Sequence, residues 1–149
     1  MVKVLVKKLH PKVKLPSYKT QGSSGMDLMA FIENSIKINP NSSALIPTGI
    51  SVAIPIDVEI QIRPRSGLAA KLNISVLNTP GTVDSDYRGE IKVILFNHSS
   101  KEFIVKNKDR VAQMILMPVL KVDFEEVDSL PESVRGLGGF GSTGRWKII

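Results

Sequence analysis

The sequence predicts an all-β domain, either a β-sandwich or a jelly roll. Three observations lead to this fold class. Apolar and polar residues alternate with a period of two in several segments, two apolar runs are nearly continuous, and turn-forming residues separate these segments. A period of two places successive side chains on opposite faces of a strand. Many short strands joined by regular turns are typical of sandwiches and jelly rolls.

The individual strands follow from these patterns. Residues 58–63 alternate apolar and polar side chains, which predicts a half-buried strand, and residues 2–6 and 36–38 repeat the pattern. The apolar runs at residues 91–96 and 111–117 predict strands that are buried on both faces. Turn signals separate these strands, at Asn39-Pro40-Asn41, Pro47-Thr48-Gly49, Asn78-Thr79-Pro80-Gly81 and Asn97-His98-Ser99.

Composition favours a single globular domain with an anionic partner. The chain has 149 residues and a hydrophobic share of 42%, enough to build a packed core. Lys plus Arg exceed Asp plus Glu by 20 − 14 = 6, a surplus that equally fits a merely basic surface. The positive charges form no stripe with interleaved aromatics, so a phosphate-bearing small molecule fits better than nucleic acid.

Compartment and membrane association are constrained by what the sequence lacks. The longest apolar runs are too short to cross a bilayer, and the lysine-flanked N-terminus is typical of a first strand rather than a signal peptide. The sequence contains no cysteine, which excludes disulfides and thiolate metal sites. We therefore expect a cytoplasmic protein.

The C-terminal end differs from the rest of the chain. Residues 123–132 carry five acids and no base, and residues 133–149 hold five glycines. So glycine-rich a stretch builds no core of its own. We therefore expect a folded domain over residues 1–132 and a mobile tail over residues 133–149.

The tail also carries groups that suit a nucleotide. Glycine backbone N–H groups, the hydroxyls of Ser142 and Thr143 and the guanidinium of Arg135 are all phosphate donors. Phe140 offers a flat face that could cover a base. A flexible tail without a role is the alternative, but an aromatic residue between glycines favours a closing lid.

A second candidate segment is PRSGLA, residues 64–69. One short helix is predicted at Ser66–Asn73, where Leu68 and Leu72 would meet one turn apart. The N-terminus of a helix offers free N–H groups to an anion. Ser66 alone fits a plain N-cap equally well, but Arg65 beside it favours a phosphate site.

A third segment, GTVDSDYRGE at residues 81–90, follows a Pro-Gly turn. It offers the carboxylates of Asp84 and Asp86 and the ring of Tyr87. A carboxylate that accepts a proton from water is a general base for hydrolysis. On composition alone, a solvated acidic loop or an Asx turn is the better interpretation, and Tyr87 fits a plain structural aromatic.

Polar residues also interrupt two apolar strands. Asp27 lies between apolar neighbours, where an acid must be paired with a cation, and Arg110 and Gln113 lie on an equally apolar strand. For all three the commoner explanation is a satisfied structural residue. The two histidines, His10 and His98, are too isolated for a metal site, so substrate phosphates would hold any divalent ion.

Five segments, taken in chain order, resemble the five motifs of the trimeric dUTPase family, the deoxyuridine 5′-triphosphate nucleotidohydrolases. They are residues 23–30, 64–69, 81–90, 110–116 and 135–144. The resemblance runs from Ser23 to Gly144. It implies a jelly-roll β-barrel, a homotrimer with active sites shared between subunits, and a tail that closes over each site. It also implies Mg²⁺-dependent hydrolysis of dUTP to dUMP and pyrophosphate. This reaction would limit uracil incorporation into DNA and supply dUMP for dTMP synthesis.

The resemblance further implies how the nucleoside is recognised. Asp84 would deprotonate the water that attacks the α-phosphorus, and would contact the 3′-hydroxyl of the sugar. Tyr87 would pack against the deoxyribose and leave no room for a 2′-hydroxyl. Asn78 and the backbone from Gly81 to Val83 would read the edge of the uracil.

The phosphates and the metal would be handled by other matching residues. Asp27 would lie near the magnesium waters without ligating the ion, and Arg110 would support the site. No direct protein ligand to Mg²⁺ is expected. Phe140 and Gly141 would close over the base, and the phosphates would be held by Arg65, Ser66, Gly67, Gln113, Arg135, Ser142 and Thr143.

Three alternatives differ in function. A dCTP deaminase would share the fold, but would not be expected to combine Asp84 and Tyr87 with this tail. A non-catalytic nucleotide sensor would keep the fold for signalling. A basic nucleic-acid binder would show a steep salt dependence of affinity. We expect no stable binding to nucleic acid or membrane.

Overall fold

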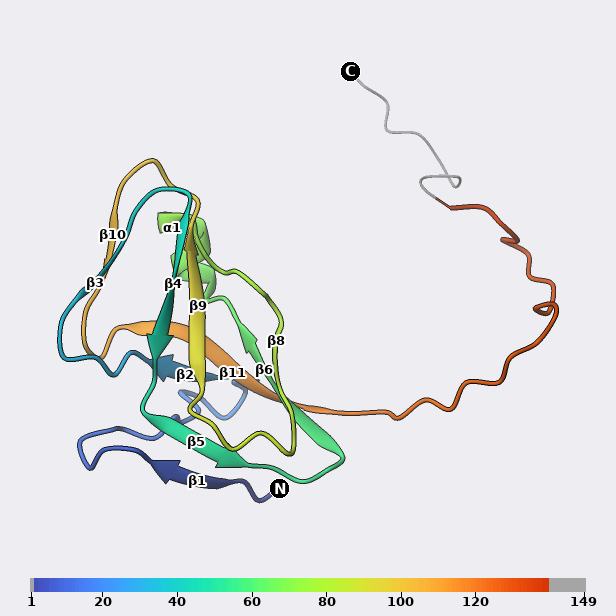
Figure 1. Ribbon diagram of the computed structural model, residues 1–149, viewed down its shortest axis with the longest axis horizontal. Coiled ribbons are helices and arrows are strands. Elements are labelled where there is room, and N and C mark those ends of the chain that lie inside the picture. Colours follow the sequence, from blue (N-terminus) through green and yellow to red (C-terminus); the bar gives the residue numbers. More distant parts are fainter. Residues whose placement is uncertain (1, 140–149) are drawn as a thin grey trace.

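The computed structural model describes residues 2–139, which contain eleven strands and one short helix (Figure 1). The all-β prediction is therefore confirmed. The elements are β1 Leu5–Lys8, β2 Met26–Met29, β3 Ile36–Ile38, β4 Ser42–Pro47, β5 Ile50–Ala53, β6 Val58–Arg63, α1 Ser66–Leu72, β7 Ile74–Val76, β8 Gly81–Val83, β9 Lys92–Asn97, β10 Phe103–Val105 and β11 Arg110–Pro118.

The strands form antiparallel sheets around one aliphatic core. The largest sheet has the order β2-β11-β6-β8, and a second has the order β4-β9-β7. Two pairs, β1-β5 and β10-β3, complete the wall. Isoleucine, leucine and valine side chains fill the core, including Ile46, Ile60 and Leu95, each at most 1% exposed. Apolar side chains on the inner faces of the strands other than β1 thus drive closure of the wall.

The strand patterns bear out the predicted alternation, with one correction. In β6 the side chains alternate between buried and half-buried, as predicted. The prediction that β9 and β11 are buried on both faces is wrong, because their outward side chains are exposed or half-buried in most positions. The wall is one layer deep in a single chain, so its outer face meets no second layer.

Helix α1 begins at Ser66, one residue earlier than it would if Ser66 were its N-cap. Its N-cap is Arg65, with no side-chain hydrogen bond, so the interpretation of Ser66 as a plain N-cap is wrong. The helix ends before Asn73, which adopts the left-handed conformation with φ of 54°. Leu68 packs against the core, whereas Leu72 is exposed.

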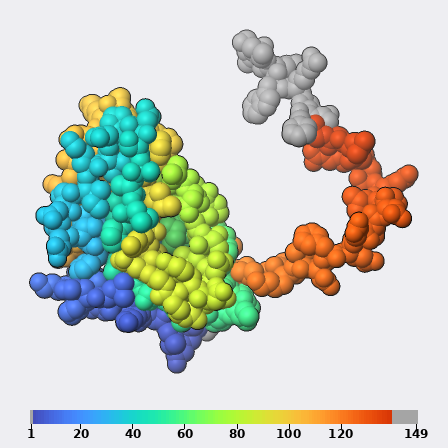
Figure 2. Space-filling view, in the orientation of Figure 1, coloured from blue at the N-terminus to red at the C-terminus, as the bar shows by residue number. Residues whose placement is uncertain are grey.

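Beyond Val119, whose N–H donates to the carbonyl of Asp57 at 2.9 Å, the chain leaves the body (Figures 1 and 2). We call residues 120–139 the C-terminal arm. Its apolar side chains face solvent, with Leu120 95% and Phe124 88% exposed. The division of the chain at residue 132 stays a prediction. Within the described residues, no helix is long and apolar enough to cross a membrane.

One buried polar residue ties three segments together. Asn97 at the end of β9 is fully buried, and its amide nitrogen donates to the carbonyls of Ile38 at 3.0 Å and Lys101 at 2.7 Å. Its amide oxygen accepts the backbone N–H of Ser99 at 2.9 Å and the Ser99 hydroxyl at 2.7 Å. Every hydrogen-bonding group of this side chain is thus used at a site without solvent.

We expect Asn97→Ala to lower the free energy of unfolding by about 3 kcal/mol, because it leaves buried carbonyls without donors. Urea denaturation measures the loss. The matched control is Asn107→Ala, whose exposed side chain accepts one N–H from Ile32 at 3.3 Å and should cost less than about 1 kcal/mol. Equal losses of unfolding free energy in the two variants would contradict the stabilising role of the Asn97 hydrogen bonds.

Candidate active site

Five residues predicted from sequence, four polar ones and a glycine, line one depression beside the start of α1. Gln113 of β11 lies directly opposite Asp27 of β2 in the ladder, and opposite Arg63 at the end of β6. β11 therefore lies between β2, which carries Asp27, and β6, which leads to Arg65 and the start of α1. We call this set the phosphate cluster; its members are Asp27, Arg65, Ser66, Gly67 and Gln113.

Asp27 binds Arg65 of the phosphate cluster and also Arg110, which lies outside it. Its Oδ1 accepts a hydrogen bond from Arg65 Nε at 2.8 Å, and its Oδ2 accepts one from Arg110 Nη1 at 3.3 Å. The side chain of Asp27 is only 14% exposed, so the predicted pairing of this acid with a cation is confirmed. Because Arg65 uses Nε for this contact, its two Nη nitrogens remain suited to a bidentate anion.

Gln113 holds the backbone at the entrance to α1. Its Nε2 donates to the carbonyl of Pro64 at 2.9 Å. A Cβ atom at Gly25 would lie 2.6 Å from Gln113 Oε1, so any side chain there would push the amide from its present position. We did not predict a role for Gly25 from the sequence. The signal that could have pointed to it is a glycine two residues before Asp27, directly before β2.

A second group of predicted residues lies on and after β8. β8 is an edge strand, so one side of its backbone carries unpaired N–H and C=O groups. Asn78 folds over the start of this strand, since a Cβ at Gly81 would lie 3.1 Å from Asn78 Nδ2. Val83 is buried and ends the strand, and Asp84 follows it in an exposed position.

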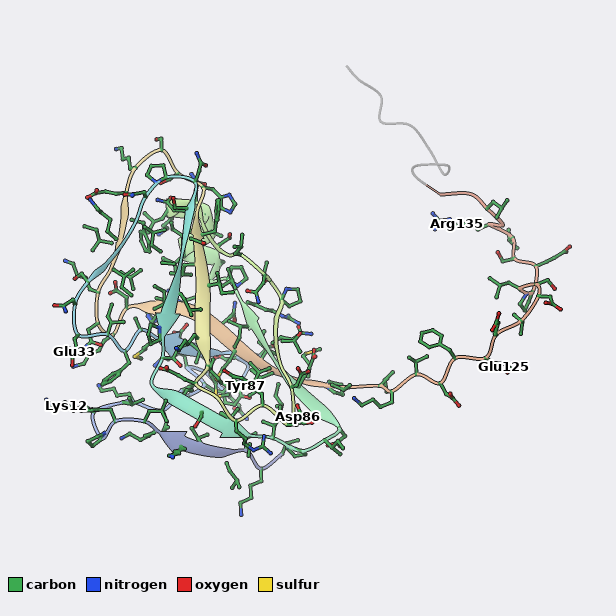
Figure 3. The ribbon with its side chains drawn as sticks, viewed as in Figure 1. Lys12, Glu33, Asp86, Tyr87, Glu125 and Arg135 are labelled. Carbon is green, nitrogen blue, oxygen red and sulfur yellow. The ribbon has the colours of Figure 1, made fainter. Side chains whose placement is uncertain are left out.

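Asp84 opens onto its own depression on the body. It shares this depression with Glu59 of β6 and with the neighbouring Asp86. Tyr87 closes the turn, because its N–H donates to the carbonyl of Asp84 at 3.2 Å and its hydroxyl donates to the carbonyl of Glu90 at 3.0 Å. Figure 3 places Asp86 and Tyr87 together on this part of the body.

Within one chain the two groups lie apart. Val83 pairs with Ile60 of β6, and Gly81 pairs with Ile62, so Asp84 continues toward Glu59. Arg65 lies beyond the other end of β6, six residues from Glu59. At about 3.3 Å per residue this separation is roughly 20 Å. The phosphate cluster and Asp84 therefore lie in two separate depressions of a single chain.

The last predicted residues lie on the arm or beyond it. Arg135 lies on the arm, away from Tyr87 and Asp86, and its Nε donates to the carbonyl of Gly138 at 2.6 Å (Figure 3). The predicted tail contacts Phe140, Gly141, Ser142 and Thr143 lie outside the described residues. In residues 2–139, no three His, Cys, Asp or Glu side chains are grouped so as to hold a metal ion.

The sequence matches known proteins along nearly its whole length. A family model described as dUTPase matches residues 11–144. A deoxyuridine 5′-triphosphate nucleotidohydrolase of Picosynechococcus sp. is 53% identical over 137 residues, covering 92% of this chain and 95% of that protein. One of Hydrogenobaculum sp. is 52% identical over 143 residues, covering 96% and 99%. These matches favour a hydrolase over the deaminase alternative.

Solved structures share the fold. The dUTPase of Staphylococcus bacteriophage 80alpha with dUPNHPP has a TM-score of 0.86 at 20% identity, covering 96% of this chain and 99% of that chain. A mutant dUTPase of phage phi11 of S. aureus, described with a structural Mg(II) ion, has a TM-score of 0.78 at 17% identity. The likeness confirms the predicted jelly roll. The chain belongs to the dUTPase family, a family of hydrolases, as its sequence predicted.

Proposed function

We propose that the protein hydrolyses dUTP to dUMP and pyrophosphate, by attack of an Asp84-activated water on the α-phosphorus. The site would be shared between the subunits of a homotrimer. The observation that carries this proposal is the separation of Asp84 from the phosphate cluster along β6. A triphosphate is much shorter than this separation, so Asp84 of one chain would act on phosphates held by another.

The phosphate cluster suits a triphosphate because its arginine is already oriented. Arg65 is held by Asp27 at 2.8 Å, so little side-chain entropy is lost when a phosphate binds. The exposed N–H groups of Ser66 and Gly67 begin α1 beside it. Electrostatic stabilisation of this kind is usually the largest contribution to such a reaction.

Mg²⁺ would be coordinated by the oxygens of the triphosphate rather than by protein side chains. Asp27 is the carboxylate of the phosphate cluster, and both its oxygens already bind arginines. These residues fit an ion whose ligands are phosphate oxygens and waters, with Asp27 facing the water shell. Bound there, the ion would neutralise charge on the phosphates as pyrophosphate leaves.

Asp84 would supply the base, and the hairpin around it would select the nucleoside. The unpaired edge of β8 offers backbone donors and acceptors to a uracil, with the amide of Asn78 beside them. Backbone groups cannot swing aside, so they would exclude the methyl group of thymine. If cytosine bound instead of uracil, the fixed donors and acceptors of this backbone would be left without hydrogen-bond partners. Tyr87 would pack on the deoxyribose and exclude a 2′-hydroxyl.

The C-terminal arm would join the subunits. Leu120, Val122 and Phe124 alternate with charged residues, as in a half-buried strand, yet they are exposed in the single chain. β1 offers a strand whose four residues are all exposed, beside a cavity of about 290 Å³ lined by apolar side chains such as those of Val4 and Leu116. Such an edge accepts an added strand.

The distribution of charge also favours contact between the C-terminal arm of one subunit and β1 of another. Residues 1–19 contain six lysines and no acid, whereas the arm contains five acids and two bases. A neighbour's arm along β1 would therefore bring opposite charges together and bury the exposed apolar residues. Arg135, Phe140, Gly141, Ser142 and Thr143 would then reach the site of another subunit.

Physiologically, the reaction would limit uracil incorporation into DNA and supply dUMP for dTMP synthesis. The cysteine-free sequence fits a reducing compartment, and we assign the protein to the cytoplasm.

We expect Asp84→Asn to lower kcat by about 10²- to 10⁴-fold with little change in KM, because it removes the base and leaves the phosphate cluster intact. Steady-state pyrophosphate release from dUTP measures both constants. Asp86→Asn is the matched control, since it removes a carboxylate from the same depression and should keep kcat. A near-native kcat in Asp84→Asn would refute the assignment.

Two truncations separate the two parts of the C-terminal region. A chain ending at residue 134 keeps the apolar half of the arm, so it should stay trimeric but lose turnover with Arg135 and the residues that follow. A chain ending at residue 118 should also dissociate, because nothing covers β1. Analytical ultracentrifugation and pyrophosphate release test both forms. Normal turnover by the first form, or a trimer of the second, would contradict the role of the arm.

A further inference from the structure

The ring of Tyr87 lies directly against the backbone of Gly89. A Cβ atom at Gly89 would lie 2.5 Å from Tyr87 Cζ and 2.9 Å from Tyr87 Cε2, and closer still to the hydroxyl oxygen. Real Cβ contacts are essentially never this short. The ring thus occupies the space that any side chain at position 89 would need.

Space, rather than backbone conformation, is what position 89 requires. Among the glycines of residues 2–139, those with φ in the left-handed region are Gly49 and Gly136. Gly89 adopts a φ that an L-residue tolerates, so alanine would not strain the backbone there. The contact with the Tyr87 ring is therefore the physical reason for glycine at this position.

The ring is held at its far end by a fixed point of the fold. The hydroxyl of Tyr87 donates to the carbonyl of Glu90. Glu90 is itself anchored, because its Oε1 accepts the N–H of Gly49 at 2.9 Å and the next N–H, of Ile91, donates to Ile50 at 2.9 Å. The ring is thus tied to Glu90, which in turn is bound to the corner between β4 and β5.

We infer that Gly89 is a specificity-determining residue, which positions the Tyr87 ring and so sets the discrimination between deoxyribose and ribose. This inference rests on the proposed role of Tyr87 at the sugar. A methyl group at position 89 would displace the ring from the Glu90 carbonyl. Because Tyr87 is 45% exposed, the ring has room to swing into solvent, so the fold would survive while the wall against the 2′-hydroxyl moves.

The test compares kcat/KM for dUTP with kcat/KM for UTP. Gly89→Ala should lower this ratio by about tenfold or more, the scale of a steric contact at one group, without lowering the melting temperature. Gly22→Ala is the matched control, because its Cβ would meet no atom within 4 Å. It should keep the wild-type ratio. A general loss of rate on both substrates would leave the ratio unchanged and would overturn the inference.

Tyr87→Ala, alone and combined with Gly89→Ala, tests the positioning role of Gly89 separately from the proposed role of Tyr87 at the sugar. If position 89 acts through the ring, the double variant should have the ratio of Tyr87→Ala, since no ring remains to displace. A further drop in the double variant would overturn the inference. If Tyr87→Ala lowers the ratio and Gly89→Ala does not, the inference fails alone. If Tyr87→Ala keeps the wild-type ratio, the proposed sugar role fails, and the inference with it.

Discussion

The antiparallel pairing of β6 with β8 is the constraint on which the site depends. The ladder opposes Ile62 with Gly81 and Ile60 with Val83, so it carries the chain toward Asp84 in the direction away from Arg65. Sliding the register by one residue would turn the buried face of β8 outward, so the separation cannot relax. A chain built in this way keeps Asp84 apart from the phosphate cluster, and under the proposed mechanism a complete site requires another copy.

Neighbouring groups restrain side chains in both the phosphate cluster and the turn around Tyr87. Asp27 holds two arginines, and Gln113 holds the carbonyl of Pro64, where the absence of a side chain at Gly25 leaves room for the amide. Gly89 plays the corresponding part beneath Tyr87. Side chains held in this way lose little freedom when a ligand binds, which is what orientation of a phosphate requires.

Much of this arrangement could be predicted from sequence, because local patterns determine it. The alternation in residues 58–63 predicted β6, and an acid between apolar residues predicted a paired Asp27. The two-faced burial expected for β9 and β11 was wrong, because apolar runs do not reveal whether their second layer is another subunit. The roles of Gly25 and Gly89 were missed because they depend on where the side chains of Gln113 and Tyr87 lie in the folded chain, which residue order alone does not give.

Mixing subunits tests most directly whether the site is shared. Arg65→Ala and Asp84→Asn chains, each with little activity alone, are refolded together in equal amounts. If Arg65 of one chain serves Asp84 of its neighbour, mixed trimers should regain about one quarter of the wild-type sites, since each site draws its two halves independently. If both residues serve the same site within one chain, the mixture should show no gain over the separate variants, which would contradict the account.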